Sequence, residues 1–192
     1  MLAIFLDMET TGLDPRQHFA IDIALKIVDL STFEIKATYQ SIVKQPRENW
    51  LNHDPVSVQI NGYTWESLQQ GKEPFLVSKE IIDLFDSFGI ERGTSVFICQ
   101  NPAFDRGFFT QLVDVYTQER LNWPYHWLDL ASMYWAKVVQ RSHERGVPFP
   151  VRMNLSKNQI AKEFGLQPEA DRHEALNGVD HLIKCYRAVL GA

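Results

Sequence analysis

Two carboxylates, Asp7 and Glu9, stand at the end of the first apolar run of the chain. Because side chains alternate along a strand, a strand over Leu2 to Met8 places both on one face, with Leu6 and Met8 on the other. Two carboxylates held this close repel each other unless a cation lies between them, and hard divalent ions prefer oxygen ligands. The pair suits a divalent-metal site, although a strand that simply emerges into water would show the same spacing.

The turn that follows, Thr10-Thr11-Gly12-Leu13, combines two hydroxyls with one apolar side chain. Such a turn also exposes backbone N–H groups. We expect it to hold the sugar and phosphate of a nucleotide while Leu13 packs against a base. A plain connection between two strands is the alternative interpretation.

Two later segments add groups of the same chemistry. Asp105 falls in the first turn of a helix expected over Ala103 to Val115, where an acidic residue is also a common partner of the helix dipole. His173 and Glu174 precede the last helix, with Asp180 downstream. A histidine beside acidic groups suits a general base near neutral pH, although a histidine near a helix start is also a common surface or capping residue.

The elements that must position these groups are strands first and alternating helices later. The expected strands cover residues 2–8, 21–28, 33–43 and 94–99, and a break at Ser31-Thr32 makes the second and third antiparallel neighbours. Helices are expected after Asp54-Pro55 and over residues 75–88, 103–115, 129–139, 155–164 and 174–190, with Gly89 ending the second. The Pro- and Gly-containing segment 140–154 is the expected mobile loop. This order predicts a mixed α/β layer fold.

Composition limits the class of protein. A chain of 192 residues with 45% hydrophobic residues is expected to form one domain, without a membrane-spanning segment or a signal peptide. Cys99 and Cys185 are expected to be two buried free thiols, which indicates a reducing cytoplasm. The net charge of −5 argues against binding of nucleic acid through a broad basic surface. It permits an enzyme that contacts phosphate through bound cations.

The segments described above also resemble a known family. The run from Phe5 to Leu13 is similar to the first motif of the DEDD exonuclease superfamily, in its DnaQ-like and RNase T-like branches. The run from Asn101 to Asp105 resembles the second motif, and His173-Glu174-Ala175 resembles the opening of the third motif in the histidine-containing DEDDh subgroup. Segments around Asn61-Gly62 and over Leu155 to Leu166 are also similar, so the resemblance runs in order over nearly the whole chain.

The third motif departs from the family pattern. The position five residues after His173 carries an aspartate in the subgroup, and here it is Gly178. Asp180 lies two residues further on, which rotates a helical side chain by about 200°. A bulge or a shifted helix start could bring Asp180 into the site, and Asp171 is a weaker substitute. Gln100 stands where many relatives carry histidine.

The resemblance implies an RNase H-like fold, a mixed sheet flanked by helices, over a single exonuclease domain 1–192. It implies a 3′-5′ exonuclease that hydrolyses phosphodiester bonds at the 3′ end of DNA or RNA with two Mg²⁺ or Mn²⁺ ions and releases nucleoside 5′-monophosphates. Asp7, Glu9, Asp105 and Asp180 would hold the ions, and His173 would take a proton from the attacking water. The implied substrate contacts are Thr10, Thr11, Gly12, Leu13, Asn101 and Phe104.

The implied partner is a single-stranded 3′ end of nucleic acid, and the resemblance leaves a homodimer or a polymerase partner open. An oligoribonuclease-type enzyme for short RNA is an alternative within the same superfamily. A nucleic-acid-binding module that has lost catalysis is an alternative of another class, because Gly178 removes an expected metal ligand. A structural scaffold would require three ordered coincidences.

Overall fold

The centre of the fold is a mixed sheet with the strand order β3-β2-β1-β4-β5. The structure is a computed structural model that describes residues 1–169 and 172–192. Its strands are β1 (Leu2–Thr10), β2 (Ala20–Asp29), β3 (Glu34–Ile42), β4 (Ser95–Cys99) and β5 (Trp127–Asp129). The first three strands pair antiparallel, and β4 and β5 are parallel to their neighbours. The expected mixed sheet and its antiparallel start are confirmed.

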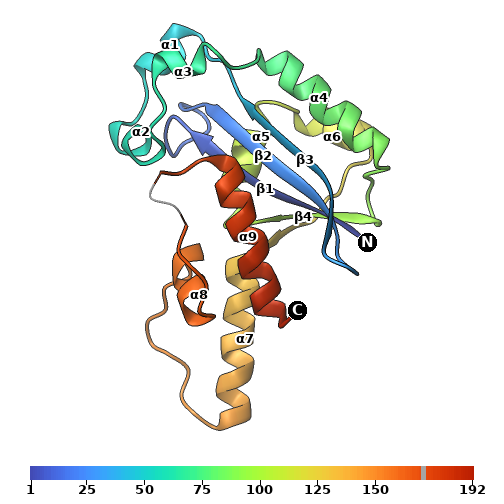
Figure 1. The fold of residues 1–192 in the computed structure, drawn as a ribbon, viewed down its shortest axis with the longest axis vertical. Coiled ribbons are helices and arrows are strands. Elements are labelled where there is room, and N and C mark those ends of the chain that lie inside the picture. The colour runs from blue at the N-terminus through green and yellow to red at the C-terminus, as the bar shows by residue number, and fades with distance from the viewer. Residues whose placement is uncertain (170–171) are drawn as a thin grey trace.

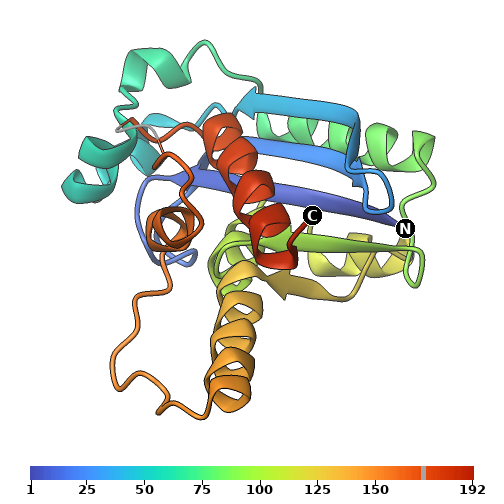
Figure 2. The same ribbon diagram turned by 60° about the horizontal axis from the view of Figure 1, so that its bottom comes forward.

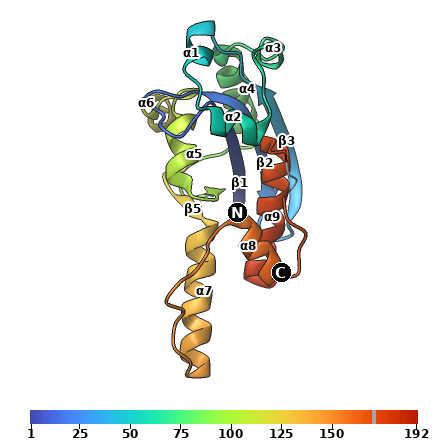
Figure 3. The same cartoon turned by 90° about the vertical axis from the view of Figure 1, so that its left-hand side faces the viewer.

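Helices occupy both faces of this sheet. Over the described residues they are α1 (Arg47–Leu51), α2 (Pro55–Asn61), α3 (Trp65–Leu68), α4 (Pro74–Ser87), α5 (Pro102–Phe109), α6 (Val115–Arg120), α7 (Leu130–Arg145), α8 (Lys157–Glu163) and α9 (Ala175–Leu190). Helix α9 crosses one face of the sheet, whereas α4, α5 and α6 cover the other (Figures 1 and 3). None of the described helices has the length and apolar character that crossing a membrane requires.

Two expected helix boundaries were wrong. The helix expected over residues 103–115 ends at Phe109, because Asp114 caps a new helix by accepting hydrogen bonds from the backbone N–H groups of Tyr116 and Thr117. Helix α7 runs to Arg145, six residues beyond the expected end, and stops at Gly146 with a left-handed φ of 62°. The connection expected over residues 140–154 therefore begins only after α7, where it projects from the body with that helix (Figure 2).

Alternation along β1 separates two hydrophobic cores. The even-numbered side chains Ile4, Leu6 and Met8 join the core under α4 and α5. The odd-numbered Ala3 and Phe5 join the core under α7, α8 and α9. Two residues further along the same odd-numbered face come Asp7 and Glu9, so the strand that builds the centre of both cores also aims these carboxylates toward the α9 layer. Both cysteines are buried free thiols, as expected.

Phe97 of β4 is the centre of an aromatic cluster in the core under α4 and α5. Its ring stacks on Trp127 at 4.0 Å between centroids and meets Phe85 and Phe109 at 6.0 and 5.8 Å. Phe97 is fully buried, so its loss leaves a cavity that the neighbouring rings cannot fill.

We predict that Phe97→Ala lowers the free energy of unfolding by about 4 kcal/mol, because a buried ring is lost and a cavity remains. Thermal denaturation measures this as a fall in Tm of roughly 10 °C. Tyr116→Ala is the matched control, since Tyr116 is 84% exposed. Equal effects of the two substitutions would contradict the packing described above.

Candidate functional site

The end of β1 places two carboxylates on the face that α9 covers. Asp7 lies opposite Ala24 and Glu9 opposite Asp22 in the antiparallel pairing with β2. The register shifts between Glu9 and Thr10, so the strand pairing becomes irregular immediately after the second carboxylate. The sequence alternation therefore sets where these carboxylates point, and the irregularity marks where the turn begins.

The turn after β1 is held by its own side chains. The Thr10 hydroxyl donates a hydrogen bond to the Gly12 carbonyl at 2.7 Å, and the Thr11 hydroxyl accepts one from the Phe19 N–H at 2.9 Å. A Cβ at Gly12 would lie 2.3 Å from the His18 ring, so this position requires glycine. Leu13 is left 73% exposed at the tip of the turn. The turn thus offers one apolar side chain to a ligand from a fixed backbone.

Asp105 enters the site from the opposite layer, on the first turn of α5. Asn101, just before the helix, has a left-handed φ of 58°, and its N–H donates to a carboxylate oxygen of Asp129 at 3.0 Å. Pro102 then starts the helix, where the missing N–H is tolerated. Asp105 is 3% exposed, and the Phe104 ring beside it packs at 4.9 Å from the ring of Phe108. Its carboxylate is therefore fixed rather than free at the surface.

These groups line one cavity of about 290 Å³. The sequence candidates around it are Asp7, Glu9, Thr10, Leu13, Phe104, Asp105 and His173. His173 comes from the segment before α9, where its N–H donates to the Ile60 carbonyl at 3.4 Å. Among the described residues the lining leaves out Thr11, Gly12 and Asn101. The Thr11 side chain is turned inward to Phe19, so it supports the turn from behind.

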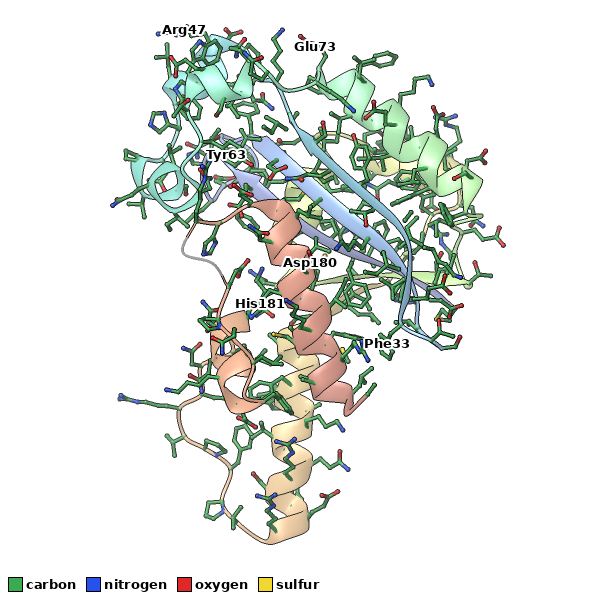
Figure 4. All side chains as sticks on the ribbon, in the orientation of Figure 1. Phe33, Arg47, Tyr63, Glu73, Asp180 and His181 are labelled. Carbon is green, nitrogen blue, oxygen red and sulfur yellow. The ribbon has the colours of Figure 1, made fainter. Side chains whose placement is uncertain are left out.

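Asp180 does not reach this cavity, which corrects the expectation that it could replace the missing aspartate. Its carboxylate forms an ion pair with Lys26 of β2, and its side chain is 42% exposed. Helix α9 begins at Ala175 without a bulge, so the two-residue offset from Gly178 keeps its rotation. Figure 4 shows Asp180 and the neighbouring His181 on α9. Asp171 lies outside the described residues.

Burial and mutual repulsion dominate the electrostatics of the carboxylates. Burial, followed by the charge of Asp7, raises the pKa of Glu9 to about 8. The same two causes raise the pKa of Asp105 well above its ordinary value. Burial and the charge of Glu169 raise the pKa of Asp7, against the lowering effect of Lys157. Burial therefore disfavours the ionised form of all three carboxylates, and the charge of Asp7 adds to this effect at Glu9 and Asp105.

Lys157 and Glu169 are two charged residues that sequence reasoning missed. The Lys157 ammonium lies 3.3 Å from Asp7 Oδ1 and 3.2 Å from Glu169 Oε1. Lys157 lines the same cavity as the carboxylates. A basic residue at the start of a short helix, more than 140 residues from Asp7, carries no signal in a single sequence that would connect the two.

Asp22 is a third missed residue, and it positions the site from beneath. It is fully buried opposite Glu9 and accepts hydrogen bonds from the Tyr63 hydroxyl at 2.7 Å and the Ala175 N–H at 3.0 Å. It thereby ties β2 to the first residue of α9 and to the segment after α2. An acidic residue inside the apolar strand segment Ile21-Asp22-Ile23 is the signal that could have found it.

The oxygen donors fit a divalent cation. Asp7, Glu9 and Asp105 offer carboxylates alone, the ligand type that Mg²⁺ and Mn²⁺ prefer. Burial raises their pKa values and the charge of Asp7 adds to the rise at Glu9 and Asp105, so a positive charge among them would favour the ionised forms. Within residues 1–169 and 172–192, no three acidic, histidine or cysteine side chains already surround one point.

Comparison with known proteins gives a family and several structures of the same fold. The RNase T family model, described as an exonuclease, matches residues 4–186. The zinc-bound complex of E. coli exonuclease I with single-stranded DNA aligns with a TM-score of 0.76 and 18% identity, over 99% of this chain and 40% of that chain. Exonuclease I of Methylocaldum szegediense gives 0.74 and 21%, over 99% and 40%.

A third structure with a similar fold is a 3′-exonuclease that recognises an RNA. A 3′-exonuclease bound to the histone mRNA stem-loop aligns with a TM-score of 0.70 and 15% identity, over 100% of this chain and 64% of that chain. At these identities the likeness shows the fold, and this fold is the RNase H-like one expected from the sequence. The chain spans about two fifths of the length of the exonuclease I proteins. A search of curated proteins gave no match.

We predict that Glu9 makes the metal-free protein less stable as the pH rises. Its pKa is raised from 4.5 to about 8 on folding, so between these values the folded protein holds a proton that the unfolded chain has released. Stability is therefore lost across this window. In EDTA, Glu9→Gln should raise Tm by on the order of 5 °C above pH 8 and leave it nearly unchanged near pH 4. A difference in Tm that does not vary with pH would contradict this assignment.

We also predict that Mn²⁺ raises Tm by roughly 5–10 °C at an ion concentration about 100 times Kd, because the ion binds only the folded carboxylate cluster. Asp7→Asn should abolish most of this shift. Asp180→Asn removes the same charge outside the cavity and should keep the shift. Calorimetric or fluorescence melts with and without Mn²⁺ measure it, and an unchanged shift in Asp7→Asn would count against the site.

Proposed function

This chain belongs to the exonuclease family that the RNase T model describes, and on that premise we propose that it is a metal-dependent 3′-5′ exonuclease. It removes nucleotides from single-stranded 3′ ends of DNA or RNA and releases nucleoside 5′-monophosphates. The observation that carries this proposal is the cavity where β1 and α5 bring Asp7, Glu9 and Asp105 together beside His173. Carboxylates and an imidazole around one cavity suit hydrolysis of a phosphodiester.

The carboxylates have the role of holding the cation. A divalent ion bound there would supply positive charge to the scissile phosphate and acidity to a water molecule. Asp7, Glu9 and Asp105 provide its oxygen ligands. How many ions the site holds depends on Lys157, whose ammonium already contacts Asp7. A cation bound to the carboxylates would reverse the sign of the local charge. A protein with a net charge of −5 could then bind the negatively charged nucleic acid at this site.

His173 is the proposed general base. Its imidazole takes a proton from the water whose oxygen forms the new bond to phosphorus. The bond from phosphorus to the 3′ oxygen of the preceding nucleotide breaks, and that oxygen takes up a proton from solvent. The departing nucleotide keeps its phosphate on the 5′ side. His173 suits this role because it lines the same cavity as the three carboxylates.

The turn after β1 and helix α5 bind the terminal bases. Leu13 is exposed at the mouth of the cavity, and Phe104 lines it from the side of α5. Apolar and aromatic side chains bind unpaired bases through their faces, which favours single strands. The Asn61 side chain donates to the Thr10 carbonyl at 3.0 Å and fixes the turn against α2. E. coli exonuclease I, which has a similar fold, is found in complex with oligonucleotides, and this supports single-stranded nucleic acid as the substrate class.

One observation favours a second candidate, a 3′-end-binding module without catalysis. Gly178 supplies no carboxylate to the cavity, and Lys157 already neutralises Asp7. Such a module would bind a 3′ end equally well in EDTA and in Mn²⁺, and would release no nucleotide. Turnover that depends on a divalent ion excludes it.

The decisive assay uses single-stranded DNA and RNA labelled at either end, digested in Mn²⁺ or EDTA. We predict that a 3′ label is released as a mononucleotide and that a 5′ label gives a ladder of shortened strands, only with the metal. Asp105→Asn should lower kcat by at least about 100-fold, because a buried metal ligand is lost. Asp180→Ala should keep wild-type turnover. Release of the 5′ label first, or turnover in EDTA, would refute the proposal.

A further inference from the structure

Lys157 is a buried cation inside the carboxylate cluster. Its side chain is 13% exposed and lies between Asp7, 14% exposed, and Glu169, 4% exposed. The ammonium is within ion-pair distance of both carboxylates, 3.3 Å from Asp7 Oδ1 and 3.2 Å from Glu169 Oε1, and such contacts favour the charged form of a lysine. The side chain therefore carries its positive charge at neutral pH, and because it lines the cavity it faces any ligand that enters.

Gly178 creates the space for this arrangement. A Cβ at this position on α9 would lie 1.8 Å from Asp7 Oδ2 and 3.1 Å from Glu169 Oε1. Glycine inside a helix costs about 1 kcal/mol relative to alanine, so its presence calls for a packing reason. Here the reason is that the carboxylates of Asp7 and Glu169 fill the volume next to α9 that a side chain at 178 would take.

Glu169 is held in place independently of β1. Its backbone N–H donates to the Asn158 side chain of α8 at 2.8 Å. Its second carboxylate oxygen lies 3.9 Å from His181 Nδ1, and His181 is itself held through a 3.1 Å contact between Nε2 and the Gln167 carbonyl. Helices α8 and α9 thus fix the Glu169 carboxylate, which in turn fixes the Lys157 ammonium against Asp7.

The ammonium also limits what else Asp7 can bind. One oxygen of Asp7 contacts Lys157, and the other faces Gly178. An ion on the α8 side of Asp7 would have to share this space with a positive charge and would be repelled by it. Glu9 and Asp105 differ from Asp7, because their carboxylates have no ion-pair partner among the described residues. A cation in the cavity would therefore meet no competing ammonium at these two side chains.

We propose that Lys157 is a catalytic residue of this site: anchored on Asp7 and Glu169, its ammonium acts as a fixed cation toward the scissile phosphate, and the site takes one divalent ion instead of two. This inference rests on the proposed exonuclease function. Asp7, Glu9 and Asp105, which line the cavity, would hold that one ion. The ammonium donates hydrogen bonds to a non-bridging phosphate oxygen, as a charged donor does most strongly in a buried site.

The test counts ions. Titration calorimetry with Mn²⁺ should give one ion per chain for the wild-type protein. Lys157→Met removes the ammonium without adding a carboxylate to the cavity, so it should also bind one. Lys162→Met, an exposed lysine of the same helix, is the matched control and should still bind one. A count of two, or of none, in the wild-type protein overturns the proposal without any variant.

Turnover separates the role of the ammonium from that of the fold. Lys157→Met should lower kcat at saturating Mn²⁺ by at least about 100-fold while one ion still binds, and Lys157→Arg should recover part of the loss because it keeps the charge. Unchanged kcat in Lys157→Met overturns the proposal. If the wild-type protein binds one Mn²⁺ and releases no nucleotide, the exonuclease function fails while the ion count stands.

Discussion

The crowding of buried carboxylates at the end of one central strand is the constraint on which the site depends. Asp7 and Glu9 project from β1 into a space that α5 and α9 close, and Asp105 adds a third acid from the helix. Burial raises the pKa of all three, and the charge of Asp7 adds to this rise at Glu9 and Asp105, so positive charge beside the cluster stabilises its ionised form. The protein supplies part of that charge as Lys157, and a bound cation is the proposed source of the rest.

The fold meets this constraint by bringing four separate segments to one end of the central strands of the sheet. Strand β1 is central and packs in both cores, which makes its end a rigid platform. Asp22, buried beneath Glu9, fastens the start of α9 to that platform. Rigid support keeps together acidic groups that would otherwise move apart because they repel each other. Clusters of repelling charged groups are common at catalytic sites.

Sequence reasoning reached the parts of this structure that local rules determine. Strand alternation predicted the shared face of Asp7 and Glu9, and apolar runs predicted β1 to β4 and most helices but missed β5. It failed where contacts between segments far apart in the sequence determine the structure. The end of α5 depends on the cap at Asp114, and the contacts of Lys157 and Glu169 depend on how α8 and α9 pack. Asp180 was linked to the site by spacing alone, and its pairing with Lys26 could not be read from one sequence.

The most direct measurement of the central claim is the anomalous scattering of a crystal of this protein soaked in Mn²⁺. The account predicts a single strong peak within coordination distance of the carboxylates of Asp7, Glu9 and Asp105, with the Lys157 ammonium still on Asp7. The absence of a peak at these carboxylates, or a peak at Asp180 instead, would contradict it.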